Sequence, residues 1–396
     1  MTEAFLVGGA RTPVGKFGGA LAEVRADDLA ALVVGAVVER NGIDPAAIDD
    51  VILGAANQAG EDNRNVARMA VLLSGLPHSI PGFTVNRLCA SGLQAIASAS
   101  QAIQSGDIAV AIAGGAESMT RAPWVMAKPG TPWAKPPEMA DTSLGWRLVN
   151  PRMRDIEGGD ATLSLGACTE KLASLHGISR DEADAYAARS QSLAAQCQES
   201  GGVEGDIVAV ATRGGDVVVD ETVRAGTTVE VLARLKPSFA SDGIVTAGNA
   251  SPLSDGASAL IVSSGEALER HGLVPRARIR GYAVAGVEPS LFGMGPVPAI
   301  RSLLDKTGVS LDEVDVVEIN EAFAAQVLVC QKLLGVELDQ LNPAGGALAL
   351  GHPLGSSGSR IAITALGQLE RTQGRYAIIS LCIGVGQGAA MLIERV

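Results

Sequence analysis

Three side chains in this sequence combine reactive chemistry with an unusual local setting, and the first is Cys89. It lies in a polar turn directly before a run of helix-forming residues, so we expect it at or next to a helix N-terminus. Unpaired backbone N–H groups and the helix dipole at such an end favour a thiolate and lower a cysteine pKa from ~8.5. Cys89 is therefore a candidate nucleophile, although a lone cysteine in a packed turn is also a common small core residue.

The second candidate is His352, which differs from the other histidines in its surroundings. Glycines flank it on both sides, at Gly345, Gly346, Gly351 and Gly355. Glycine allows a ligand or a second stretch of backbone to approach closely. His352 is therefore a candidate acid or base in a binding site. The remaining three histidines are expected at the surface: His78, His176 and His271.

The third candidate, Cys382, lies at the end of an apolar strand and is followed by a glycine-rich turn that begins at Gly384. Such a turn leaves backbone N–H groups available to a ligand, but it is also compatible with a tight connection between strands. Asn320 stands in a polar turn directly after another apolar strand and completes this set.

The residues that must position these side chains form alternating strand and helix patterns. In the first part of the chain we predict strands at 5–7, 51–54 and 108–113, and helices at 28–40, at 65–73 and after Cys89. Alternation of this kind, in a chain rich in alanine, valine and glycine, predicts an α/β enzyme. We expect a mostly parallel sheet with helices on both faces.

The last part of the chain repeats this order. We predict strands at 277–282, 316–319, 376–381 and 389–393, and helices at 296–306, 323–334 and 356–371. The turn and helix after Cys89 then correspond to the turn and helix after His352. If the two halves pack about a pseudo-dyad, both helix N-termini meet in one cleft.

The segment between the halves is less regular. It contains several prolines and tryptophans and one strongly capped helix at 179–197. We interpret residues 121–246 as a lid inserted over the core. The predicted domains are therefore an N-terminal half at 1–120 completed by 247–270, the lid at 121–246, and a C-terminal half at 271–396.

Bulk properties exclude some classes of protein. The net charge of −12 disfavours binding to nucleic acid. The 5 cysteines have no paired spacing, which indicates a reducing compartment and neither a disulfide framework nor a zinc site. We find no signal peptide and no apolar run long enough to cross a membrane, so we expect a cytoplasmic protein with no membrane partner.

These residues carry a resemblance to a known family. The chain is similar to the thiolases in four motifs that occur in the family's order: 86–92 (NRLCASG), 320–324 (NEAFA), 345–355 (GGALALGHPLG) and 382–384 (CIG). Residues 11–15, 114–119 and 246–251 match as well, so the resemblance covers nearly the whole chain. It implies a duplicated five-layer α/β/α/β/α core of two half-domains with an inserted lid.

The resemblance also implies a reaction, the reversible ping-pong cleavage of a 3-ketoacyl-CoA to acetyl-CoA and a shortened acyl-CoA. Cys89 would accept the acyl group, His352 would take its proton, and Cys382 would be the second acid/base. The backbone N–H groups of Cys89 and Gly384 would form one oxyanion site, and His352 with a water held by Asn320 would form the other. No metal is implied.

Coenzyme A would be the co-substrate and acyl-CoA the substrate, in a homodimer or homotetramer. Positions matching the family's CoA and substrate contacts are Ser251, Arg224, Ala250, Ser164 and Arg147. Pro252 and Ser254 replace the glycine and asparagine usual in that loop.

Residues 60–68, 141–147 and Val385 are similar to β-ketoadipyl-CoA thiolases, whose acyl chain ends in a carboxylate. Arg147 or Arg152 could bind that carboxylate, or could equally form a surface ion pair.

Other functions stay open at this point. One is a general 3-ketoacyl-CoA or acetoacetyl-CoA thiolase. A decarboxylating ketoacyl synthase would need a second histidine where this chain has Asn320. A non-catalytic acyl-CoA binder would not need Cys89, His352 and Cys382, and all three are present.

Overall fold

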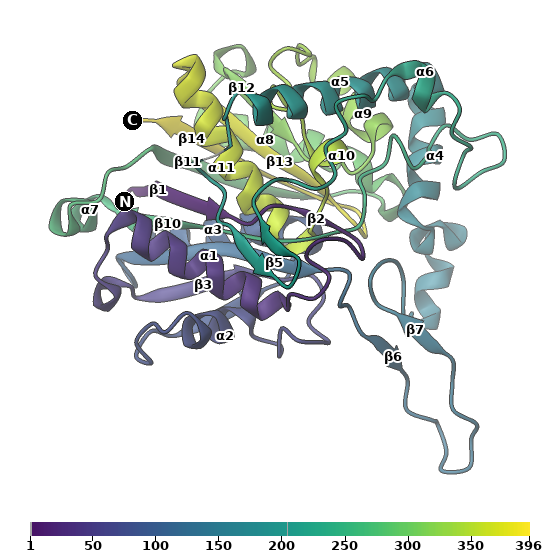
Figure 1. Cartoon of the computed structure of the whole chain (residues 1–396). Coiled ribbons are helices and arrows are strands. Elements are labelled where there is room, and N and C mark those ends of the chain that lie inside the picture. The colour runs from purple at the N-terminus through teal and green to yellow at the C-terminus, as the bar shows by residue number, and fades with distance from the viewer. Residues whose placement is uncertain (1, 204) are drawn as a thin grey trace.

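Figure 1 shows a computed structural model of the chain, which describes residues 2–203 and 205–396. Among these residues, one large sheet of ten strands has the order β12-β13-β14-β11-β1-β10-β5-β3-β4, with β2 paired to β10. The sheet strands of the first half are β1 (Ala4–Arg11), β2 (Gly15–Lys16), β3 (Asp50–Gly54), β4 (Gly82–Val85), β5 (Val110–Ser118) and β10 (Ser254–Ser264). Those of the second half are β11 (Ala277–Gly286), β12 (Val316–Ile319), β13 (Tyr376–Ile383) and β14 (Gln387–Arg395).

The prediction of a mostly parallel sheet was wrong. Only β12 with β13, and β3 with β4 and β5, are parallel among the described strands. The pairs β1–β10, β10–β5, β1–β11, β11–β14 and β13–β14 are antiparallel. Apolar runs in a sheet covered on both faces do not encode strand direction, so the sequence pattern left the direction undetermined.

The repeat predicted from the order of elements is confirmed. From the centre of the sheet outward, the first half has the order β1-β10-β5-β3 and the second half has the order β11-β14-β13-β12. The halves meet where β1 pairs with β11, a short antiparallel contact of Phe5 with Arg278 and Leu6 with Ala277. Each of these strands in the first half therefore lies as many strands away from the β1–β11 contact as its counterpart in the second half.

Three large hydrophobic clusters show how the layers stack. The first lies between the first half-sheet and the helices α1 (Ala26–Asn41) and α2 (Val66–Leu73). The second surrounds α3 (Ser91–Ser105) and α11 (Leu354–Thr372) and touches strands of both half-sheets. The third joins the second half-sheet to α8 (Pro296–Thr307) and α9 (Ala324–Leu334).

Neighbouring residues of one strand enter different clusters. On β5, Ile112 packs in the first cluster and Ala113 in the second. On β13, Ile378 packs in the third and Ile379 in the second. Each half-sheet is therefore covered on both faces, which gives the predicted five-layer α/β/α/β/α core.

The two central helices approach each other at their N-termini because glycines remove the side chains between them. A Cβ atom on Gly92 would lie 2.8 Å from the carbonyl oxygen of Gly355, and one on Gly358 would lie 2.3 Å from the amide nitrogen of Leu93. Only Ala90 separates Cys89 from the start of α3, and only Pro353 separates His352 from the start of α11. The predicted meeting of the two helix ends is therefore confirmed.

The segment between β5 and β10 forms small elements whose strands stay outside the large sheet. They are β6 (Trp124–Met126), β7 (Met139–Asp141), η3 (Pro151–Thr162), α4 (Leu165–His176), α5 (Arg180–Glu199), β8 (Val210–Thr212), β9 (Gly215–Val217) and α6 (Val229–Leu232). In Figure 1 the β6–β7 hairpin extends away from the body, while α4 and α5 lie over the second half. Helix α5 begins with a capping box in which Ser179 and Glu182 satisfy each other's backbone N–H groups.

The remaining elements are short: η1 (Pro45–Ala47), η2 (Leu88–Ala90), α7 (Gly265–His271), η4 (Pro289–Met294), η5 (Leu311–Glu313) and α10 (Ala347–Leu350). Across the described residues, no helix has the length and apolar character needed to span a bilayer.

Candidate active site

The turn that presents Cys89 is held by side-chain hydrogen bonds. Leu88 has a φ of 45°, a left-handed conformation that is uncommon for leucine. The Oδ1 atom of Asn86 accepts the N–H of Leu88 at 2.9 Å, and its Nδ2 atom donates to the carbonyl of Ala56 at 3.0 Å. Ser91 Oγ donates to the carbonyl of Leu88 at 2.7 Å. The turn η2 therefore places Cys89 directly before the N-terminus of α3.

Burial raises the pKa of Cys89 to about 11, so the predicted lowering of this pKa was wrong. Hydrogen bonds from the backbone N–H groups of Gly384 and of Cys89 itself act in the opposite direction, but the loss of solvent outweighs them because the side chain is buried. The buried carboxylate Glu117 raises the pKa further. At neutral pH the group is a thiol and needs a base.

The turn before α11 has a backbone that only glycine accommodates easily. Gly351 has a φ of 97°, and a Cβ atom there would lie 2.3 Å from Ser254 Oγ. That hydroxyl accepts the backbone N–H of His352 at 3.2 Å. Gly351, one of the glycines that singled out His352 in the sequence, therefore serves close packing of the turn against β10.

The imidazole of His352 is buried and has a polar contact on each nitrogen. Its Nε2 atom lies 3.3 Å from Asn320 Nδ2, and its Nδ1 atom lies 2.6 Å from Ser357 Oγ. Burial, with a smaller contribution from the positive charge of Arg360, lowers the pKa of His352 to about 3. The ring is therefore neutral at pH 7 and has a lone pair that can accept a proton.

Asn320 joins this ring to the second half-sheet. It follows β12, and its backbone N–H donates to the carbonyl of Ser380 on β13 at 2.9 Å. Its buried Oδ1 atom has no hydrogen-bond partner among the described residues. An amide oxygen in this position can accept a hydrogen bond from a water or a ligand beside His352.

Cys382 lies on β13 with its side chain fully buried. Burial raises its pKa well above the ordinary value, and the neighbouring Cys89 raises it further. Cys382 packs in an apolar cluster with Cys168, Val245, Phe292, Ala322 and Phe323. Cys89 is therefore close enough to influence the ionisation of Cys382, which lies beside an apolar wall.

Gly384, in the turn after Cys382, faces the Cys89 turn. A Cβ atom there would meet the side chains of Leu88 and Leu165 at 3.7 Å. Of the predicted site residues, the structure thus places Cys89 near both Gly384 and Cys382. It also places His352 next to Asn320.

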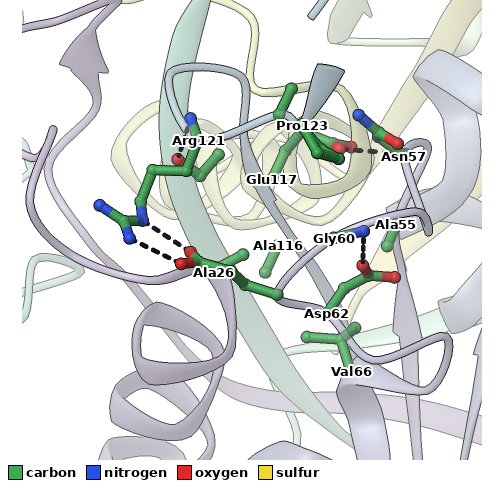
Figure 2. Close-up of a pocket in the computed structure, with 13 residues that line it drawn as sticks. Ala26, Ala55, Asn57, Gly60, Asp62, Val66, Ala116, Glu117, Arg121 and Pro123 are labelled. Atoms are coloured by element: carbon green, nitrogen blue, oxygen red, sulfur yellow. Dashed lines mark hydrogen bonds and ion pairs between the residues drawn. The ribbon is translucent and has the colours of Figure 1, made fainter. Parts of the chain in front are cut away.

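A cavity lies between the loop after β3 and the end of β5, and its wall includes Glu117, whose charge acts on Cys89. Figure 2 shows Asn57, Asp62, Glu117 and Arg121 on its walls. Glu117 accepts backbone N–H groups from Ala56 at 2.8 Å, Asn57 at 3.1 Å and Gly355 at 2.8 Å. Burial raises the pKa of Glu117 to about 7 despite these donors. The carboxylate joins the loop after β3 to the start of α11.

The residues predicted to contact CoA or substrate differ in their exposure to solvent and in their hydrogen bonds. Ser251 donates its backbone N–H to the carbonyl of Ala322 at 2.9 Å, and Ala250 packs against the cluster that contains Cys382. Arg224 is exposed. The Ser164 hydroxyl caps α4 by accepting the N–H of Ala167 at 3.3 Å.

Arg147 makes a guanidinium contact of 3.4 Å with the carbonyl of Gly145. It has no carboxylate within 4 Å among the described residues. Its neighbour Trp146 donates Nε1–H to the carbonyl of Leu163 at 3.3 Å, and Leu163 packs against the cluster that contains Cys382.

Sequence reasoning missed three polar residues of this site. Ser357 contacts the His352 ring, Ser254 holds its backbone, and Glu117 joins the loop after β3 to the start of α11. Ser254 drew attention only as a departure from the family, and Glu117 only as part of a matching motif. The spacing of Ser357 five residues after His352, at the start of a helix, was the one local sign that their side chains could meet.

Comparisons with known proteins agree with this geometry. Residues 4–266 match the family described as thiolase, N-terminal domain, and residues 273–395 match thiolase, C-terminal domain. A β-ketoadipyl-CoA thiolase of Pseudomonas aeruginosa is 53% identical, with 100% of this chain and 99% of that protein covered. A 3-oxoadipyl-CoA/3-oxo-5,6-dehydrosuberyl-CoA thiolase of Escherichia coli is 52% identical, with 100% of both chains covered.

A solved structure is similar over the same length. Human mitochondrial 3-ketoacyl-CoA thiolase, crystallised in complex with CoA, has a TM-score of 0.93 and 39% identity, covering 100% of this chain and 98% of that one. The family models match both halves of the chain on either side of α7. The chain belongs to the thiolase family.

Proposed function

We propose that the chain is a CoA-dependent thiolase that cleaves 3-oxoadipyl-CoA to acetyl-CoA and succinyl-CoA, or catalyses the reverse condensation. The observation that carries this proposal is identity of 53% and 52%, over the whole chain, with thiolases named for this substrate. A buried thiol and a neutral buried imidazole before two helices that approach each other support the chemistry, because a neutral imidazole can accept a thiol proton.

In the first half-reaction Cys89 gives its proton to His352, and its sulfur forms a bond to C3 of the substrate. The C2–C3 bond then breaks, Cys382 protonates the departing enolate at C2, and acetyl-CoA leaves. In the second half-reaction CoA gives its thiol proton to the Cys382 thiolate and attacks the acyl group. Cys89 leaves and takes its proton back from His352, so every group is restored.

Two oxyanion sites assist these steps. Backbone N–H groups of Cys89 and Gly384 stabilise the tetrahedral intermediate on the Cys89 sulfur, and the same two groups act to lower the pKa of that sulfur in the resting site. His352 Nε2 and a water held by Asn320 stabilise the enolate oxygen of acetyl-CoA. The buried, unpartnered Oδ1 of Asn320 supports this role.

Substrate contacts are proposed for the family-matched positions. Ser251, Ala250 and Arg224 bind CoA. Ser164 would contact CoA through the exposed part of its residue, since its hydroxyl caps α4. Arg147 binds the distal carboxylate of the acyl chain, and the lack of a carboxylate partner for its guanidinium among the described residues supports this assignment.

The remaining parts of the proposal rest on the family resemblance. Residues 121–246 form a lid over two half-domains, 1–120 with 247–270 and 271–396. The protein acts in the cytoplasm as a homodimer or homotetramer, and its chemistry uses no metal.

The deciding experiment measures CoA-dependent cleavage of 3-oxoadipyl-CoA, acetoacetyl-CoA and a medium-chain 3-ketoacyl-CoA. We expect the highest kcat/KM with 3-oxoadipyl-CoA and no activity in Cys89→Ala. Equal or better cleavage of a monocarboxylic substrate would instead indicate a general 3-ketoacyl-CoA or acetoacetyl-CoA thiolase. Binding without cleavage of any substrate would indicate an acyl-CoA binder.

The distal contact has its own test. Arg147→Ala should lower kcat/KM for 3-oxoadipyl-CoA by about 10-fold and leave acetoacetyl-CoA unchanged, since one charge-assisted hydrogen bond contributes ~1.5–3 kcal/mol. Arg152→Ala tests the alternative arginine, and a selective loss there instead would assign the contact to Arg152. A loss of equal size with both substrates would assign Arg147 to the folding of the lid.

A further inference from the structure

The contact between His352 and Ser357 indicates which nitrogen of the imidazole ring carries the proton. Both side chains are buried, and Ser357 Oγ lies 2.6 Å from His352 Nδ1 and 2.9 Å from the carbonyl oxygen of Pro353. A serine hydroxyl has a single proton to donate. If that proton pointed to Nδ1, the hydroxyl and carbonyl oxygens would face each other at 2.9 Å with no hydrogen between them. The hydroxyl therefore donates to Pro353 and accepts from Nδ1–H.

The contact at the other ring nitrogen, Nε2, agrees with this assignment. Asn320 places its Nδ2 atom 3.3 Å from His352 Nε2. An amide NH₂ group only donates, so Nε2 must present its lone pair. Both contacts select the tautomer that carries its proton on Nδ1.

This tautomer is the one that the reaction needs. The base must present a lone pair toward the Cys89 thiol at Nε2, the nitrogen on the Asn320 side. Catalytic histidines are commonly held in one tautomer by a carboxylate, and loss of that carboxylate can cost ~10⁴-fold in rate through the wrong tautomer. In this chain the Ser357 hydroxyl, which donates to the carbonyl of Pro353, takes the place of that carboxylate.

We propose that Ser357 is a positioning residue whose hydroxyl holds His352 in the Nδ1–H tautomer and so keeps a lone pair on Nε2, which faces Asn320 in the resting site and takes the proton of Cys89 in the reaction. The inference rests on the proposed role of His352 as the base. It predicts that Ser357 affects the rate of proton transfer and leaves substrate binding almost unchanged.

The experiment compares Ser357→Ala with Ser359→Ala in the full-length protein. Ser359 is buried in the same helix and donates to the carbonyl of Ser356 at 2.9 Å, but it does not touch His352. We expect Ser357→Ala to lower kcat by about 10- to 100-fold with KM within about 2-fold, and Ser359→Ala to keep the wild-type kcat. Alkylation of Cys89 by iodoacetamide should slow in Ser357→Ala alone. Ser357→Thr, which keeps the hydroxyl, should recover activity.

A second measurement does not depend on turnover. With ¹⁵N-labelled histidine, a long-range ¹H–¹⁵N correlation distinguishes a protonated ring nitrogen from one with a lone pair, and the chain has only 4 histidines to assign. The wild type should show the proton on Nδ1 of His352, and Ser357→Ala should lose that preference.

The outcomes separate this inference from the proposed function. A proton found on Nε2, or equal kcat in Ser357→Ala and the wild type, would overturn the inference. An equal loss in both serine variants would assign Ser357 to packing only. If His352→Ala retained full activity, the assignment of the base would itself fail, whatever Ser357 did.

Discussion

The Cys89 turn and the His352 turn occupy equivalent places in the two halves of the molecule, yet their neighbours differ. Each turn precedes a central helix, and each reactive side chain is almost completely buried. The thiol has the negative Glu117 nearby, which raises its pKa, whereas the imidazole is influenced by the positive Arg360, which lowers its pKa.

Both charges act against an ion pair between thiolate and imidazolium. Burial acts in the same direction and is the larger cause at each site. Both groups are therefore neutral in the resting protein, and in the proposed mechanism proton transfer would be coupled to formation of the bond between sulfur and substrate. In that mechanism Cys89 would be activated by the imidazole more than by the N-terminus of the helix that follows it.

The largest expected effect comes from removing the reactive groups one at a time. Cys89→Ala should lose at least ~10³-fold in kcat/KM and form no acyl-enzyme, because the nucleophile is gone. His352→Ala should still form the acyl-enzyme, but more slowly than the wild type. Intact-protein mass spectrometry after mixing with 3-oxoadipyl-CoA would detect the succinyl adduct. An adduct in Cys89→Ala would place the nucleophile elsewhere.

The close approach of the two helix ends can be disturbed directly. Gly358→Ala would put a Cβ atom 2.3 Å from the amide nitrogen of Leu93, and we expect a loss of about 1–3 kcal/mol in stability together with reduced activity. Gly35→Ala, in α1, meets only Ser74 at 3.7 Å and should gain about 0.5–1 kcal/mol. Urea unfolding measures both. Equal stability of the two variants would contradict a tight contact between α3 and α11.

The neutral state of His352 predicts a dependence of stability on pH. Its folded pKa of about 3 is below the unfolded value of 6.5, so the unfolded chain binds the extra proton and stability falls as the pH drops below 6.5. Between pH 6.5 and 4.5 this one group should remove about 2 kcal/mol.

We expect His352→Gln to lose correspondingly less stability than the wild type over this range, with His271→Gln as the surface control. Unfolding by urea at one protein concentration is the measurement. Parallel pH curves for wild type and His352→Gln would show that the imidazole is not held neutral by the fold.

The smallest effect concerns the charge of Glu117. Glu117→Gln removes a charge that raises the pKa of Cys89, so iodoacetamide should react with Cys89 at slightly lower pH than in the wild type. The difference should appear only above about pH 7, where Glu117 is ionised. Glu61→Gln, on the same cavity, is the control. A shift toward higher pH would mean that Glu117 acts through the turn geometry and not through its charge.

Much of this arrangement could be predicted from local sequence. The helix at 179–197 was recognised from its cap and exists as α5, and the strand at 316–319 coincides with β12. The motif around Cys89 and the glycines around His352 identified the two turns. Strand direction could not be predicted, because β13 and β14 are buried on both faces and carry no alternation that marks an edge or a hairpin.

The sequence by itself determined the elements, their repeated order and the reactive groups, since capping, periodicity and motifs depend on residues close together in the chain. Only the tertiary structure decided the ionisation of those groups. Glu117 lies far from Gly355 in sequence, and Asn320 far from His352, yet they are hydrogen-bonded neighbours. Burial and charges supplied by distant segments set the two pKa values, and no local pattern encodes them.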